Sequence, residues 1–67
     1  MKEELLKIGF VSGKIDPDRL HYSIENGNTI VWHEKTGTIS IHEHGILRGE
    51  LQNATLQMIL NILNSLQ

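Results

Sequence analysis

Residues 29–44, TIVWHEKTGTISIHEH, decide the fold of this 67-residue chain. The segments on either side of EKTG are rich in β-branched and aromatic residues and are the clearest strands of the chain. A four-residue turn at EKTG places Trp32 opposite Ile39. The same register places Ile30 opposite Ile41. Because this pairing gathers the large apolar side chains on one face, burial of that face sets the register.

The preceding segment, residues 15–28, is open to two interpretations. Alternating apolar residues and the turn signal Asn-Gly favour a strand over residues 20–25. The alternative is a helix that begins with Asp16 as N-cap and ends at the following glycine. We favour the strand because its central residues are mediocre helix formers. A three-residue loop at NGN would then place His21 directly opposite His33.

Shorter elements are expected on either side of these strands. Residues 2–8, KEELLKI, predict a short helix that Gly9 can cap. Residues 10–11 form a short strand or a docked extension. Residues 46–52, ILRGELQ, form a fourth short strand or lead into the last helix, and a glycine weakens the strand pattern there.

The C-terminal segment gives the strongest helical pattern. Asn53 is the expected N-cap of a helix over residues 54–66. At about 100° per residue its large apolar side chains cover an arc of roughly 200°, wider than the stripe that a helix needs to cover one sheet. No charged residue occurs in residues 51–67. We therefore predict an α+β fold with a short N-terminal helix, a three- to four-stranded antiparallel β-meander, and a C-terminal amphipathic helix packed on the sheet.

Length and composition restrict the possible classes of protein. Residues 1–67 form a single small domain, and at that size folding buries only about 60% of the surface of the unfolded chain. The chain has no cysteine, so disulfides and cysteine-based zinc sites are excluded. We expect a cytoplasmic protein, with neither a signal peptide nor a membrane partner. The formal net charge is −2 and the six basic residues are scattered, which argues against nucleic-acid binding.

Four histidines are the candidate metal ligands, namely His21, His33, His42 and His44. All four are expected on the face of the sheet away from Trp32. His33 and His42 would lie about 13 Å apart along their strands, so the four side chains are not expected to converge on one point. The pattern favours a solvated polar face over a metal site completed by a second subunit or a pH-sensing surface.

Catalytic constellations are sparse. No serine stands in a G-x-S-x-G context. Ser40 and His42 would share a face of one strand, but the sequence implies neither an orienting carboxylate nor an oxyanion donor for them. We therefore expect no enzyme activity, no catalytic residues and no cofactor.

The leading functional hypothesis is a small protein–protein interaction module that forms a homodimer. Its interface would be the excess apolar surface of the last helix, at Met58, Ile62, Leu63 and Leu66. The module would act as a regulator or inhibitor of a partner protein, a role common among small proteins of phages and mobile elements. The alternative hypothesis is a metal- or small-ligand-binding protein that uses the histidine-rich face.

Overall fold

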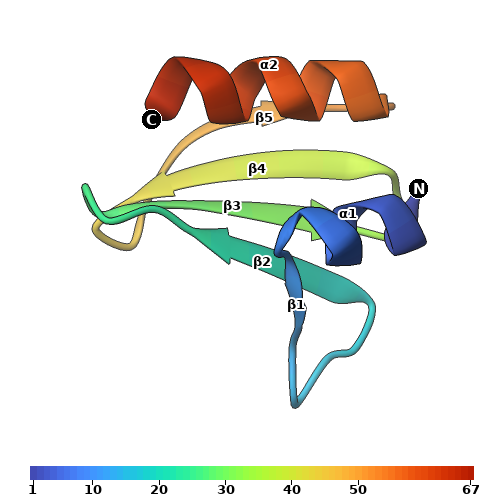
Figure 1. The fold of residues 1–67 in the computed structure, drawn as a ribbon. Coiled ribbons are helices and arrows are strands. Elements are labelled where there is room, and N and C mark those ends of the chain that lie inside the picture. Colours follow the sequence, from blue (N-terminus) through green and yellow to red (C-terminus); the bar gives the residue numbers. More distant parts are fainter.

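The computed structural model describes residues 1–67 and contains two helices and one five-stranded antiparallel sheet, whose strand order follows the sequence (Figure 1). The elements are α1 (Lys2–Ile8), β1 (Val11–Ser12), β2 (Arg19–Ser23), β3 (Asn28–His33), β4 (Thr38–Glu43), β5 (Ile46–Leu51) and α2 (Leu56–Leu66). The predicted α+β class is confirmed. The meander has five strands instead of three or four, because two residues suffice for β1 and because β5 forms a full strand.

The β3–β4 hairpin has the predicted register. Trp32 pairs with Ile39, and Ile30 pairs with Ile41. The turn EKTG is closed by a hydrogen bond from the Gly37 amide to the His33 carbonyl oxygen at 2.8 Å. This hairpin forms the centre of the sheet and sets which side chains lie on each of its faces.

Residues 19–23 form a strand that pairs with β3, so the preferred strand interpretation is confirmed and the helical alternative for residues 15–28 is wrong. The predicted register of this pair is wrong. The loop is Glu-Asn-Gly, with Ile24 and Asn28 joined by a backbone hydrogen bond of 2.8 Å. Gly27 takes the left-handed conformation (φ 92°) that such a loop requires. This shifts the pairing by two residues, and His21 therefore lies opposite Val31 instead of His33.

The last strand carries a β-bulge. β5 pairs with β4 up to Gly49 opposite Ile41, and the next pair is Leu47 opposite His42, so Arg48 is the extra residue. Five of the six residues of β5 are exposed. β5 and β1 form the two edges of the sheet.

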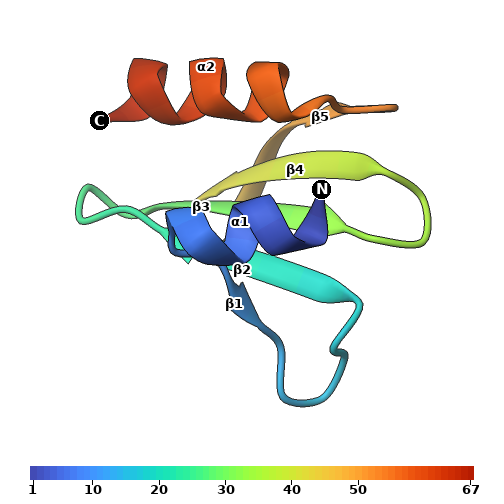
Figure 2. The same ribbon diagram turned by 45° about the vertical axis from the view of Figure 1, so that its right-hand side comes forward.

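Both helices cover the same face of the sheet (Figure 2), with α1 over β2 and β3 and α2 alongside β5. α1 has the predicted bounds and ends at Gly9. The predicted N-cap of α2 is wrong: Asn53 adopts a left-handed conformation, and Thr55 caps the helix by accepting a hydrogen bond from the Met58 amide. The threonine hydroxyl suits that role, because its oxygen accepts a hydrogen bond from one of the free N–H groups of the first turn.

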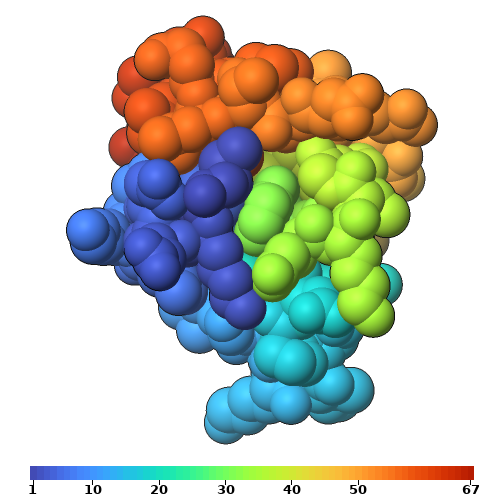
Figure 3. Space-filling model, turned by 90° about the vertical axis from the view of Figure 1, so that its right-hand side faces the viewer, coloured from blue at the N-terminus to red at the C-terminus, as the bar shows by residue number.

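The core lies between the helices and the sheet. It consists of nine buried residues, Leu5, Phe10, Leu20, Ile30, Trp32, Ile39, Ala54, Ile59 and Leu63. Trp32 is buried, as its position among core-facing residues predicts, and its indole Nε1 has no hydrogen-bond partner. Figure 3 shows the N-terminal segment beside α2 on one side of the molecule, with the loop between β1 and β2 projecting from one end.

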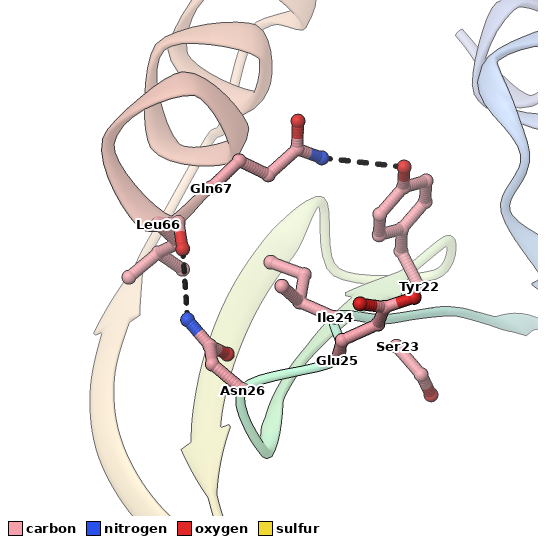
Figure 4. A pocket seen from close by; sticks show the side chains of 7 residues that line it. All are labelled: Tyr22, Ser23, Ile24, Glu25, Asn26, Leu66 and Gln67. Carbon is pink, nitrogen blue, oxygen red and sulfur yellow. Dashed lines mark hydrogen bonds between the residues drawn. The ribbon is translucent and has the colours of Figure 1, made fainter.

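Two hydrogen bonds tie the end of α2 to the β2–β3 hairpin, far away in sequence (Figure 4). The Asn26 side-chain amide donates to the Leu66 carbonyl oxygen at 2.9 Å, and the Gln67 amide donates to the Tyr22 hydroxyl at 3.3 Å. A shallow hollow of about 520 Å³ lies between these two contacts. The contacts fix the direction in which α2 crosses the sheet.

Candidate functional site

The face of the sheet opposite the helices carries the histidines, and we call it the open face. Strand alternation places His21 on β2, His33 on β3 and His42 on β4 together on this face, as predicted. The register adds Ser40 of β4 between Val31 of β3 and Glu50 of β5. Ser40 is therefore surrounded by polar side chains from three strands.

A histidine cluster forms around the Ser40 hydroxyl. The Nε2 atoms of His33 and His42 each lie 3.1 Å from Ser40 Oγ, and the hydroxyl also donates to the Val31 carbonyl oxygen at 3.5 Å. A serine hydroxyl has one proton and two acceptor lone pairs, so it can serve both rings at once. His42 pairs with Thr29, four residues along β3 from His33, as predicted. The prediction did not foresee that both rings lean toward Ser40, which lies between them.

The imidazole rings cover the middle of the open face. Ser40 is only 2% exposed and Val31 only 7%, although no helix lies over them. Burial of the ring lowers the pKa of His33 below its ordinary value of 6.5, and the Arg19 guanidinium lowers it further, while Glu50 acts in the opposite direction. The open face is therefore a small packed layer with a polar outer surface.

The other two histidines do not join the cluster. His21 lies beside the buried Val31, one strand further from Ser40. His44 lies outside the strands, in the turn between β4 and β5, with a positive φ of 50°. Its ring packs against Gly27, and its amide bonds to the Gly27 carbonyl oxygen at 3.0 Å. The expectation that His44 belongs to the open face is therefore wrong, since the turn residue joins the two hairpins instead.

The cluster brings together two nitrogen donors and one hydroxyl. No group of three or more histidine, cysteine or acidic side chains is arranged to hold a metal ion. The contact between Ser40 and His33 is like that between a catalytic serine and its base. However, Ser40 is buried beneath the imidazole rings, so a substrate cannot reach its hydroxyl in this arrangement.

A hollow of about 410 Å³ lies above the cluster. Its lining combines cationic, imidazole and hydroxyl groups with apolar side chains, and it extends from Arg19 on β2 to Leu47 and Glu50 on β5. The alternation of ISI in β4 places Ser40 on the same face as His42, as predicted, but it does not show that Ser40 lies at the centre of the histidine cluster.

The predicted interface residues of α2 have different environments. Leu63 is 5% exposed and belongs to the core of the chain itself, so it is not free to contact a partner. Ile62 and Leu66 are partly buried and pack against that core. Met58 is also partly buried but is not among the side chains packed against the core. No residue of α2 is a fully exposed large apolar side chain.

Exposed apolar side chains concentrate elsewhere, most of all on the edge strand β5. Three of the eight exposed large apolar residues are on it: Ile46 (56%), Leu47 (50%) and Leu51 (40%). Ile15, which is fully exposed, lies on the projecting loop between β1 and β2. Neither helix has the length and apolar character needed to cross a membrane.

Comparisons with known proteins do not add to this description. No model of a protein family, no curated protein and no solved structure matches the chain.

Proposed function

We propose that the chain is a small cytoplasmic protein–protein interaction module that acts as a homodimer. The observation that carries the proposal is the distribution of exposed apolar side chains. Three of the eight exposed large apolar residues, Ile46, Leu47 and Leu51, lie on the edge strand β5. An exposed edge strand that keeps large apolar side chains can pair with another chain, so it marks an interaction site or an aggregation liability.

The size of the core supports the same proposal. Nine buried residues form the main core of a chain with no disulfide. For chains of this length, apolar burial and conformational entropy nearly cancel, and association is one of the usual sources of additional stability. A dimer would bury apolar surface that the single chain leaves in water.

Sedimentation and light scattering over a wide concentration range test the proposal. We expect the mass to change from that of one chain to that of two as concentration rises, and the melting temperature to rise with it, because only the folded state associates. A folded protein with the mass of one chain and a constant melting temperature up to near-millimolar concentration contradicts the proposal.

The biological role we propose is that of a regulator or inhibitor that blocks a partner protein. The surface that favours it is the projecting loop, with Ile15 at full exposure, which lies next to β1 and β2 at the other edge of the sheet from β5. An Ile15→Asp variant should keep the fold and the dimer. If a specific partner is known from co-purification, its affinity should fall with this variant, while an unchanged affinity rules out the loop.

The second candidate function is binding of a metal ion or small ligand on the open face. It is favoured by the histidine cluster and by the hollow above it. Titration with zinc, followed by nuclear magnetic resonance of the imidazole groups, tests it. Stoichiometric perturbation that disappears in a His33→Ala, His42→Ala variant supports the site, and absence of saturable binding removes it.

A further inference from the structure

The two edges of the sheet differ in how well they are protected. β1 has only two residues, whereas β5 has six, of which five are exposed. Natural proteins usually shorten, cover or charge an edge strand, because its free N–H and C=O groups can pair with another strand. β5 has the bulge at Arg48 and two charged residues, but it has no proline and keeps three exposed large apolar side chains.

A partly uncovered apolar strip lies along the same edge on the helix side of the sheet. Met58 and Ile62, four residues apart, share one flank of α2, and both are partly buried. α2 runs alongside β5 (Figure 1). A Cβ atom added at Gly49, on the helix side of β5, would meet no atom within 4 Å, so this part of β5 is not covered. We call Ile46, Leu51, Met58 and Ile62 the edge strip.

Strand β5 is self-complementary when it pairs antiparallel with a copy of itself. Pairing over its full length puts Ile46 opposite Leu51 of the second copy, and both lie on the helix side of the sheet. The same register puts Leu47 opposite Glu50 of the second copy, and both lie on the open face. The bulge at Arg48 occurs in both copies, so in this register each side chain of β5 still lies opposite one on the same face of the sheet.

The charges permit this approach. Arg48 and Glu50 give the strand one charge of each sign, and α2 has no charged residue that would repel a second α2 beside it. We infer that the chain dimerises about a twofold axis through edge-to-edge pairing of β5, which forms one ten-stranded sheet. This inference rests on the proposed self-association and specifies its surface. The two edge strips then cover each other.

Disulfide cross-linking tests the register. Ile46 and Leu51 are both exposed and the chain has no cysteine, so Ile46→Cys and Leu51→Cys variants should fold. Facing side chains in an antiparallel pair have the separation that a disulfide needs. A mixture of the two variants should form a covalent heterodimer under mild oxidation, faster than either variant alone. Val11→Cys on the opposite edge, at a position more exposed than either Ile46 or Leu51, should not cross-link with either one.

A pair of charge variants tests the same contact without cysteine. Leu47→Glu places a carboxylate opposite Glu50 of the second copy and should weaken the dimer by roughly tenfold relative to Leu47→Lys, which places an ammonium there. Both variants remove the same apolar side chain at a 50% exposed position, so differences in folding largely cancel. Adding Glu50→Lys to Leu47→Glu should restore the affinity.

The outcomes separate the inference from the proposed function. A dimer that responds equally to Leu47→Glu and Leu47→Lys, and that gives no selective cross-link between positions 46 and 51, overturns pairing through β5 while leaving the homodimer in place. A wild-type chain that remains monomeric overturns both. Selective cross-linking together with charge rescue supports the inference.

Discussion

The two faces of the sheet bury their central residues by different means. On the helix side, α1 and α2 bring apolar side chains over Ile30 and Ile39, and both become inaccessible to solvent. On the open face no helix covers the strands, yet Val31 and Ser40 are buried almost as completely, and the rings of His33 and His42 form hydrogen bonds with the Ser40 hydroxyl. The comparison indicates that polar side chains from neighbouring strands can shield a small central residue without a helix above it.

The largest expected effect comes from removing apolar volume on the helix side. Ile30→Ala should lower the free energy of unfolding by about 2–5 kcal/mol, because the surrounding core cannot collapse fully around the cavity. Val31→Ala, on the other face, should cost less, because it removes fewer carbon atoms and no helix lies over the open face, so solvent and neighbouring side chains can fill the space. Chemical denaturation of both variants measures the difference. Equal losses would mean that the open face is packed as rigidly as the core.

A smaller effect is expected from the hydroxyl at the centre of the histidine cluster. Ser40→Ala removes the shared partner of His33 and His42 and should lower the free energy of unfolding by about 1–2 kcal/mol. Ser23→Ala, at an exposed serine of β2, is the matched control and should stay within about 0.5 kcal/mol of wild type. If both substitutions are neutral, the hydrogen bonds to Ser40 do not stabilise the fold.

The smallest expected effect is a dependence of stability on pH. The folded state lowers the pKa of His33, so the unfolded chain binds more protons once the pH falls below about 6.5. His33 therefore does not lower the free energy of unfolding above that pH. The free energy of unfolding decreases as the pH falls from about 6.5 toward the lower pKa of His33 in the folded state, and it levels off below that pKa. His33→Gln should flatten this part of the stability curve, measured by denaturation at several pH values. A decline that persists unchanged in His33→Gln would assign it to other groups.

The sequence predicts those parts of the fold in which one pattern dominates. The β3–β4 register follows from the apolar residues on both sides of a turn of fixed length, and α1 follows from a short amphipathic run that ends at glycine. The β2–β3 register does not follow, because Glu-Asn-Gly and Asn-Gly-Asn are both acceptable three-residue loops. A shift of two residues keeps every side chain on its face, so the alternation cannot distinguish them.

The candidate site is harder to predict than the fold. Alternation places three histidines on one face, but it does not show that His33 and His42 lean toward Ser40, because rotamers depend on the space above a small neighbour. The wide apolar arc of α2 predicts an interface that includes Leu63, whereas in the structure Leu63 packs into the core. The excess apolar surface is instead on β5, where a bulge interrupts the alternation that would have shown it.

The order of the strands has a consequence for how the chain folds. Every strand pairs with its neighbour in sequence, so the whole sheet can zip from one hairpin to the next with short loop closures. The contacts of α2 with the β2–β3 hairpin, such as Asn26 with Leu66, span 40 residues. We therefore expect hairpin formation to be rapid and docking of the last helix to be the late step, during which Trp32 passes from water into its buried position and its fluorescence reports the closure.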